Sequence, residues 1–304
     1  MKQIHFSIAA VERETGLSKD VLRMWERRYG FPTPERDGNG ERTYSSEQVD
    51  RLRKIKRLMD QGHRPGKLIS TADEELDMLA SRRSARQPSL ASTADDGLSA
   101  LLTLIKQHDA AGYQQAMQQR LARQGMQSFV QDTVAPLTRS VGEAWEDGNF
   151  EVFEEHLFTE LTKRLLRQAI ANLPGGLRAP RVLLTSVPEE PHVIGLLMAE
   201  SLFTLEGAEC IPLGTQMPLL EIGRAAKAHH ADIVALSFSS AFPQRQIPAL
   251  LQQLRMVLPA ETSLWAGGGG VTRLARMEGV LLLNSLDEAL SAITTWRDQH
   301  ALAA

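Results

Sequence analysis

The feature that most constrains the fold is an alternation of short apolar stretches with helical stretches in the last part of the chain. Five stretches rich in Val, Leu, Ile and Ala are each about as long as one strand, and amphipathic segments separate them. This alternation predicts a doubly wound parallel α/β sheet of about five strands over residues 178–304. The predicted strands are Arg181–Ser186, Ala208–Leu213, Asp232–Phe238, Ser263–Gly268 and Gly279–Leu283.

The residues before this sheet are predicted to form a four-helix bundle, residues 98–175. Apolar residues recur at three- and four-residue spacing in four segments, and short breaks at Asp109, Gly125 and the stretch EDGN separate these segments. Pro136 lies inside the third segment, where it removes a backbone donor and is expected to kink the helix.

A change of composition separates the bundle from the N-terminal part of the chain. Residues 80–97 are rich in Ser, Ala and Arg and lack apolar periodicity, which predicts a linker. Residues 1–71 contain 15 Lys and Arg against 10 Asp and Glu, a balance of +5 in a chain of net charge −3, so the remainder carries −8. A basic module, residues 1–79, on an acidic body predicts a polyanion as partner of that module.

Composition narrows the class of protein further. The chain has one cysteine, Cys210, which excludes a disulfide framework and argues against a thiolate metal cluster. No apolar run approaches the roughly 18 residues of a membrane span. The N-terminus lacks the apolar region of a signal peptide. We therefore expect a cytoplasmic protein without a membrane partner.

The basic module carries the sequence signals of a helix-turn-helix. An apolar stripe predicts a helix that ends at Thr15 and Gly16, and Ser18 is placed to cap a second helix from Lys19 to about Arg28. Basic residues on the second helix suit phosphates and guanine edges in a major groove; they are Lys19, Arg23, Arg27 and Arg28.

A basic hairpin and a third helix are predicted to follow. Gly38 and Gly40 favour a hairpin turn, which Arg36 and Arg42 flank to make a basic wing. Ser46 is expected to cap a basic amphipathic helix after the wing.

These motifs resemble those of the MerR family of DNA-binding regulators. The resemblance rests on SIAAVERETGLSKDVLRMWERRYG, on the wing PERDGNGERTYS and on the helix through LMDQGHRPGKLI. It implies a dimer on near-palindromic promoter DNA, although the long dimerising coiled coil of that family is replaced here by a linker. Oligomerisation must then come from elsewhere or depend on a ligand. By analogy the DNA contacts are Arg23, Arg27, Arg28, Tyr29, Arg42 and Tyr44; the alternative is that these residues form solvated helix faces.

Polar and glycine residues follow three of the predicted strands, at the sheet edge where such folds bind ligands. They are Glu190, His192 and Gly195 after the first strand, Ser237 and Ser239 at the third, and Gly267, Gly268, Gly269 and Gly270 at the fourth. An acid-x-His-x-x-Gly motif, then Ser-x-small, then a glycine run resembles the cobalamin-binding domains of methionine synthases and carbon-skeleton mutases. A His at a helix start, taken alone, is more often a cap or a surface residue.

The resemblance to cobalamin domains implies a role for each residue. His192 would be the axial ligand of cobalt, and Glu190 would hold its other ring nitrogen. Ser237 and Ser239 would offer hydroxyls to the displaced benzimidazole tail. Gly267, Gly268 and Gly269 would let that tail approach the backbone. The family acid is more often Asp, and the second Ser replaces a commoner apolar residue or Thr.

The bundle contributes a second group of candidate residues. Trp145 ends one predicted helix, and Glu155 and His156 lie one turn inside the next. An indole can cover an upper axial group, and a Glu–His pair can hydrogen-bond a ribose. The alternative is a core Trp beside a solvated Glu–His pair.

With the MerR module in front, this pattern resembles the CarH-type cobalamin-dependent photoreceptor repressors. The resemblance implies adenosylcobalamin between bundle and sheet domain, a tetramer on DNA in darkness, and its dissociation when light breaks the cobalt–carbon bond. One departure is Glu146, where the family can carry a second His beside the Trp; His108 is a substitute that the sequence does not place.

The sequence thus predicts a multidomain α and α/β protein: winged helix-turn-helix, four-helix bundle, and cobalamin-binding doubly wound parallel sheet. We expect a transcriptional regulator, a repressor rather than an enzyme, that binds duplex promoter DNA and self-associates to a dimer or tetramer. Two alternatives remain open. One is a MerR-type regulator independent of cobalamin, and the other is a component of a cobalamin-dependent methyltransferase.

Overall fold

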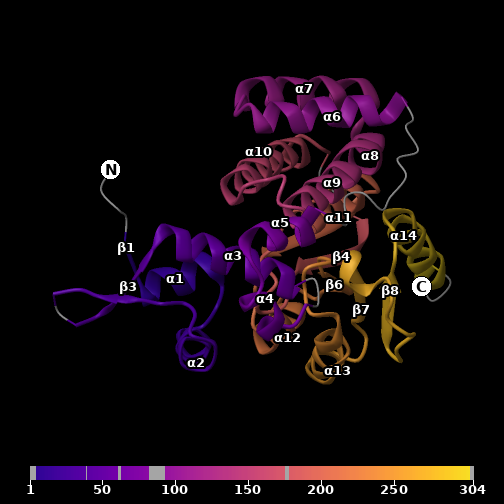
Figure 1. Cartoon of the computed structure of the whole chain (residues 1–304). Helices are drawn as coiled ribbons and strands as arrows, with labels where there is room; N and C mark the ends of the chain where they lie inside the picture. The colour runs from indigo at the N-terminus through magenta and orange to yellow at the C-terminus, as the bar shows by residue number, and fades with distance from the viewer. Residues whose placement is uncertain (1–4, 39, 61–62, 82–92, 175–177, 302–304) are drawn as a thin grey trace. The chain divides into compact units, whose positions relative to one another are not determined.

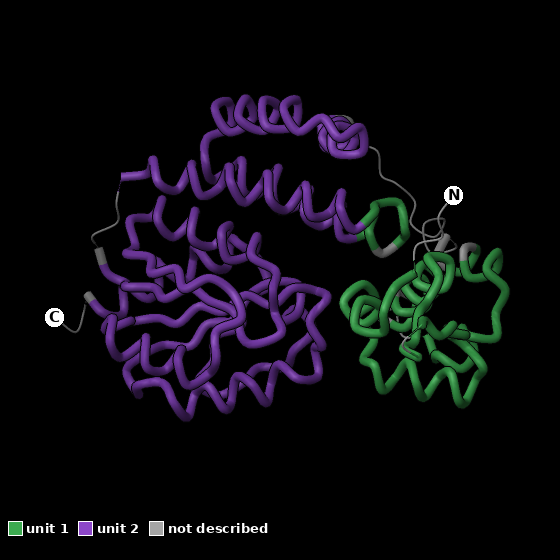
Figure 2. Tube along the Cα trace, turned by 90° about the vertical axis from the view of Figure 1, so that its left-hand side faces the viewer, with its two compact units in different colours: residues 1–91, 143–151 green, residues 92–142, 152–304 purple. Residues whose placement is uncertain are grey.

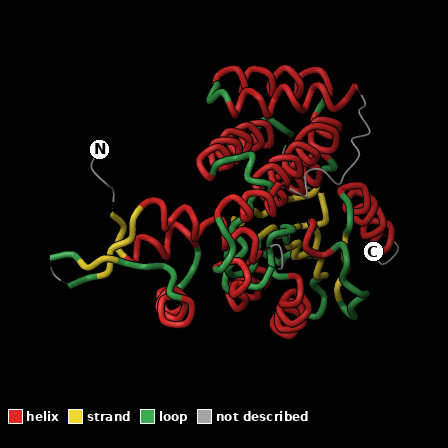
Figure 3. The backbone as a smooth tube through the Cα atoms, in the orientation of Figure 1, coloured by secondary structure: helices red, strands yellow, loops and turns green. Residues whose placement is uncertain are grey.

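The computed structural model describes residues 5–38, 40–60, 63–81, 93–174 and 178–301. The chain forms two compact units, one of residues 1–91 and 143–151 and the other of residues 92–142 and 152–304 (Figure 2). Helices dominate both units, and each unit has one sheet (Figures 1 and 3). In the part of the chain that is described, no helix is long and apolar enough to cross a membrane.

The N-terminal unit contains the predicted winged helix-turn-helix. Its sheet is antiparallel with strand order β1-β3-β2, and β2 and β3 form the wing hairpin. The elements are β1 (His5–Ser7), α1 (Ile8–Thr15), α2 (Lys19–Tyr29), β2 (Glu35–Arg36), β3 (Arg42–Ser45), α3 (Ser46–Asp60), α4 (Pro65–Ile69) and α5 (Asp73–Ser81).

Capping residues explain where the first helices begin and end. Ser18 Oγ accepts from Val21 N at the start of α2, as the sequence predicts. Gly16 and Gly30 end α1 and α2 in the left-handed region, at φ of +69° and +70°, which a residue with a Cβ rarely adopts. The predicted cap of the third helix is displaced by one residue, because Ser45 Oγ accepts from Gln48 N.

The helices before the second sheet form the predicted bundle; all of them belong to the second unit except the end of α9, residues 143–146, which is grouped with the first. The first helix of the bundle begins at Thr93, so the end of the stretch 80–97 predicted as a linker is helical; residues 82–92 lie outside the described residues. The elements are α6 (Thr93–Lys106), α7 (Ala110–Gln124), α8 (Met126–Ser128), the π-helix η2 (Phe129–Val134), α9 (Ala135–Glu146) and α10 (Val152–Ala171).

The irregularity expected at Pro136 takes the form of a π-helical turn directly before it. Ala135 N donates to Val130 O, five residues back, in place of the usual four. The wider turn accommodates a residue that has no N–H and whose ring would press on the carbonyl one α-turn earlier. Helix α8, η2 and α9 therefore run on without a loop.

The rest of this unit is a five-stranded parallel sheet, as the alternating pattern predicts. Strand order is β5-β4-β6-β7-β8, so the chain leaves β4 on one side for β5 and returns on its other side for β6. The elements are β4 (Arg178–Thr185), α11 (Ile194–Leu205), β5 (Ala208–Gly214), α12 (Leu219–Ala228), β6 (Ile233–Ser237), η3 (Gln244–Gln246), α13 (Ile247–Val257), β7 (Ser263–Gly267), η4 (Gly269–Val271), β8 (Val280–Leu283) and α14 (Leu286–Ala301).

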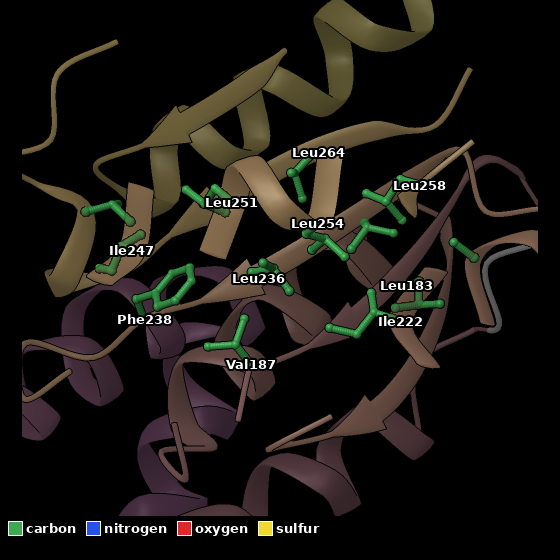
Figure 4. Close-up of a cluster of buried hydrophobic side chains, with 14 of the residues drawn as sticks. Leu183, Val187, Ile222, Leu236, Phe238, Ile247, Leu251, Leu254, Leu258 and Leu264 are labelled. Carbon is green, nitrogen blue, oxygen red and sulfur yellow. The ribbon is translucent and has the colours of Figure 1, made fainter. Parts of the chain in front are cut away.

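The two faces of the sheet bury separate cores. Leu183 and Val234 point to the face covered by α12 and α13, whose core also contains Leu236, Phe238 and Leu251 (Figure 4). The side chains that alternate with them, on the other face, pack with α11 and α14. Helix α10 packs on α11, and the α6–α7 pair lies beyond it, so the bundle stands on the α11 face (Figure 1).

Candidate functional site

The strand order places a topological switch point, called the crevice below, at the carboxyl ends of β4 and β6. The connections from these neighbouring strands lead to opposite sides of the sheet, which is where open α/β folds bind ligands. The loop after β4 carries Glu190 and His192, and the loop after β6 carries Ser239. Two residues that are 49 positions apart in the sequence, Glu190 and Ser239, are therefore brought into contact.

The loop after β4 is held in place by Ser186. Its hydroxyl donates to the carbonyl of Glu190 at 2.6 Å and accepts from the backbone N of Gln216 at 2.9 Å. The Ser186 carbonyl also accepts from Met217 N. Ser186 is fully buried, so its bonds fix the loop against the start of the next connection. The sequence analysis did not identify this residue; its position at the end of a predicted strand was the available signal.

Glu190 is the centre of the site. It is 0% exposed, and its carboxylate accepts from both sides. Nδ1 of His192 donates at 2.6 Å and the backbone N of His192 at 3.1 Å, while Ser239 donates from its backbone N at 2.7 Å and from its hydroxyl at 2.9 Å. A buried carboxylate needs such donors to stay charged. The predicted contact between Glu190 and His192 is present, so a glutamate side chain, although longer than the usual aspartate, can hold the imidazole.

The surroundings of the pair stabilise the charged form of each side chain, the carboxylate of Glu190 and the protonated ring of His192. Burial alone would raise the pKa of Glu190, but the hydrogen bonds from His192 and Ser239 together outweigh it and hold that pKa below its usual value. The hydrogen bond to Glu190 raises the pKa of His192; burial opposes this rise, and the charge of Glu155 adds to it. Glu155, from helix α10, thus acts on the same site as the sheet loops.

The ring of His192 is oriented for binding through its second nitrogen. Because Nδ1–H donates to a carboxylate, the neutral ring carries its lone pair on Nε2. The side chain is 52% exposed, although its partner is fully buried. The arrangement matches what an axial metal ligand needs, namely one nitrogen fixed and the other open.

Gly195 and Ser237 lie against one another where α11 meets the end of β6. A Cβ placed at Gly195 would lie 2.4 Å from the Ser237 hydroxyl oxygen, so a larger residue here would have to displace that hydroxyl. Ser237, at the end of β6, is partly exposed, and its role in binding a cofactor tail stays a prediction.

The glycine run after β7 has a packing role that the sequence analysis did not anticipate. A Cβ at Gly268, whose φ is +99°, would lie 2.3 Å from the Phe238 carbonyl oxygen, and one at Gly270 would lie 2.7 Å from that of Ser239. These glycines let the loop after β7 close onto the loop after β6. Gly267 and Gly269 have more room, and both are at least partly exposed. Lining of a tail pocket by these two residues and Gly268 stays a prediction.

The second predicted group lies on the first turns of α10. Glu155 Oε2 accepts from His156 Nδ1 at 2.9 Å, and its other oxygen accepts from the Thr159 hydroxyl at 2.8 Å. The His156 side chain is exposed. Trp145 lies in the last turn of α9 and is partly exposed; it belongs to the other compact unit, so its convergence with Glu155 and His156 stays a prediction.

Glu154, beside this pair, was missed by the sequence analysis. It is buried and accepts from Lys106 Nζ at 3.1 Å, with His108 Nε2 3.6 Å away. His108 also contacts the exposed ring of Phe153, with ring centroids 5.3 Å apart. The structure therefore places His108 at the α6–α7 turn, next to α10. Glu154 shares a helix face with Phe158, which was the signal for its burial.

The residues present fit a cobalt held mainly by a corrin ring. A single imidazole with a fixed tautomer suits a metal whose other ligands come from a macrocycle. The donor set at this edge of the sheet therefore agrees with the cofactor that the sequence predicts.

The N-terminal unit carries a separate candidate surface. Arg23, Arg27 and Arg28 are exposed on α2, as a DNA-reading helix requires, and the Arg28 guanidinium lies 5.3 Å from the centre of the Tyr29 ring. Arg42, at the start of the wing strand β3, is paired with Glu26 of α2. A groove of about 560 Å³ lies between α2 and the wing.

Tyr44 is buried, which contradicts the prediction that it contacts DNA. Its side chain is 0% exposed and belongs to the core of the module, with Trp25 and Leu52. Among the described residues, no atom forms a hydrogen bond with its hydroxyl. Alternation along β3 turns Tyr44 inward, and the sequence motif did not indicate which face of the strand is covered.

Two family models match the chain. The one described as "MerR HTH family regulatory protein" matches residues 6–71, and the one described as "B12 binding domain" matches residues 97–170. The first range covers the winged helix-turn-helix through α4, and the second covers nearly all of the bundle.

Two repressors of Myxococcus xanthus are similar over most of the chain. HTH-type transcriptional repressor CarH is 31% identical over 256 residues, which span 83% of this chain and 85% of the repressor. HTH-type transcriptional repressor CarA is 28% identical over 254 residues, 83% of each chain.

One solved structure supports the architecture of the second unit. The monomethylamine corrinoid protein of Methanosarcina barkeri aligns with a TM-score of 0.52 and 14% identity, over 66% of this chain and 99% of that protein. At this level of identity the likeness shows a shared fold of helices and parallel sheet.

Proposed function

Because the chain belongs to the family of MerR-type transcription regulators with a B12-binding domain, that of the repressor CarH, we propose that cobalamin bound at His192 controls its binding to promoter DNA. The observation that carries this proposal is the network in which buried Glu190 fixes Nδ1 of His192 and leaves Nε2 open. The N-terminal unit would bind the duplex, and the second unit would sense the cofactor.

Each residue of the crevice has a part in holding the cofactor. When bound, the corrin supplies a cobalt atom with an axial position for a neutral imidazole and, in its adenosyl form, a cobalt–carbon bond that light can break. His192 would hold the metal through Nε2, Glu190 would keep the ring in that tautomer, and Ser239 would hold the Glu190 carboxylate in place. Ser237, which is partly exposed, would offer its hydroxyl to the displaced tail, and Gly267, Gly268 and Gly269 would let that tail approach the backbone.

The residues on the bundle favour the adenosyl form. Glu155 holds His156 through Nδ1, which leaves an exposed ring nitrogen to hydrogen-bond a ribose. Trp145 would cover the upper axial group. Light would then be the signal, and self-association to a dimer or tetramer in darkness would strengthen repression. The proposed regulator would act in the cytoplasm and would not be an enzyme.

Spectroscopy of the purified full chain with adenosylcobalamin and hydroxocobalamin tests the site. His192→Ala should weaken cofactor retention at least about tenfold, because the axial ligand and its oriented hydrogen bond are both lost. It should also change the visible spectrum. His229→Ala, an exposed His on the loop after α12, is the matched control and should change neither. Full occupancy with an unaltered spectrum in His192→Ala would refute the site.

Regulation is tested by size-exclusion chromatography and duplex binding in darkness and after green light. We expect a larger oligomer and tighter binding with adenosylcobalamin in darkness, and reversal after illumination. A chain that binds its operator equally well with and without the cofactor would support the alternative of a cobalamin-independent MerR-type regulator. Failure to bind duplex DNA, with cobalamin retained, would favour the methyltransferase component.

A further inference from the structure

The recognition helix and the wing are joined by one ion pair. Arg42 donates from Nε to Glu26 Oε2 at 2.9 Å, and its Nη2 lies 3.4 Å from Glu26 Oε1, so the guanidinium meets the carboxylate side-on. About a third or less of each side chain is exposed, 29% for Arg42 and 32% for Glu26. The hydrogen bond and the charge of Glu26 raise the pKa of Arg42 above its usual value. This pairing fixes a long side chain at the point where the hairpin meets α2.

The pair lies in the wall of the groove between α2 and the wing. Three arginines and two acids line this groove together with Met24; they are Arg23, Arg27, Arg42, Asp20 and Glu26. Since Glu26 takes the Nε edge of the guanidinium, the Nη1 group has no acceptor among the described residues. The wall is thus basic overall, and its most rigidly held cation is Arg42.

Tyr44 is buried on the same strand as Arg42. Arg42 and Tyr44 are two residues apart on β3 and share a face of that strand. Burial raises the pKa of the Tyr44 hydroxyl, the charge of Glu26 adds to the rise, and Arg42 and Arg23 oppose it, so all four groups form one electrostatic cluster. The burial of Tyr44 thus fixes the strand two residues from Arg42.

We propose that Glu26 is a positioning residue for DNA binding: it holds Arg42 so that the remaining N–H groups of the guanidinium face the groove and receive a backbone phosphate of duplex DNA. This inference rests on the proposed DNA binding and adds a residue that does not itself touch the nucleic acid. An acid on a DNA-facing helix repels phosphates, so its presence needs a compensating effect. Glu26 supplies that effect by ordering Arg42 before DNA binds. A free arginine side chain would lose considerable conformational entropy on binding a phosphate, and the ordered Arg42 loses less.

Removal of Glu26 distinguishes this role from simple charge repulsion. The probe is a mixed-sequence duplex of about 30 base pairs, and binding of the full chain is followed by fluorescence anisotropy over roughly 50–200 mM salt. Charge alone predicts that Glu26→Ala binds DNA more tightly. The proposal predicts binding weakened by about five- to tenfold and a salt slope smaller by about one, because one phosphate contact is lost. Glu35→Ala, which removes an exposed acid from the wing strand β2, is the control and should bind as well as or better than the parent.

A double variant separates positioning from a structural effect. If Glu26 acts only through Arg42, Glu26→Ala/Arg42→Ala should bind no more weakly than Arg42→Ala alone. Glu26→Gln keeps an oxygen for the Nε bond and should restore most of the affinity, which a folding defect would not explain. Binding by Glu26→Ala that equals or exceeds the parent, with an unchanged salt slope, would overturn the inference while leaving DNA binding intact. A parent chain that does not bind the duplex would overturn the proposed function as well.

Discussion

Two glutamates in this chain each bind a basic side chain, but they differ in how far they are buried and in how many partners they have. Glu190 in the sheet domain is fully buried and accepts from His192 and Ser239 on separate loops. Glu26 in the N-terminal unit is about one third exposed and is held by one partner, Arg42. A buried carboxylate ties several segments together, because each of its donors would otherwise be unsatisfied. A partly exposed carboxylate orients a single side chain, because water can take its place as the hydrogen-bond acceptor.

The largest expected effect on stability comes from removing Glu190, the buried glutamate. Glu190→Ala should destabilise the second unit by about 3 kcal/mol, since the donors of His192 and Ser239 lose a buried acceptor. Glu26→Ala should cost less than about 1 kcal/mol, as partly exposed ion pairs do. Scanning calorimetry of the full chain measures both. Equal costs for the two variants would show that burial does not separate the pairs.

An intermediate effect is expected where α11 touches β6. Gly195→Ala should destabilise by about 1–3 kcal/mol, because the added Cβ would lie 2.4 Å from the Ser237 hydroxyl. The loss should largely disappear in Gly195→Ala/Ser237→Ala. Gly142→Ala is the control, since nothing lies within 4 Å of a Cβ there, and helix propensity predicts a gain of about 0.5–1 kcal/mol. Equal losses at Gly195 and Gly142 would contradict the contact. Thermal unfolding of each variant measures these differences.

The smallest effect is expected at Tyr44, which lies two residues from Arg42 on β3. Tyr44→Phe should be neutral or stabilise the N-terminal unit by up to about 1 kcal/mol, because it removes a buried hydroxyl for which the described residues provide no partner. Affinity for duplex DNA should not change. A clear loss of affinity at equal stability would restore the sequence prediction of a DNA contact. Calorimetry and anisotropy on the same sample separate the two outcomes.

Much of the crevice could be predicted because its residues follow strands. The motif with Glu190, His192 and Gly195 was expected at the carboxyl edge, and the contact of acid and imidazole is present. The role of Gly268 in packing on the Phe238 carbonyl was not expected. A glycine indicates that backbone comes close, but the sequence does not say whether a ligand or another loop approaches.

By itself the sequence determined most of the elements and their order: a helix-turn-helix with a wing, four helices, and five strands that alternate with helices. It did not predict β1 or α5, and the single helix predicted after the wing is divided into α3 and α4. The predicted elements follow from local periodicity and capping residues, which act over a few positions. Only the tertiary structure decided that Ser239 completes the Glu190 network, that Tyr44 is buried, and that Arg42 pairs with Glu26. The physical reason is that tertiary packing decides which residues far apart in the chain become neighbours. A buried polar side chain then forms hydrogen bonds with the polar groups beside it.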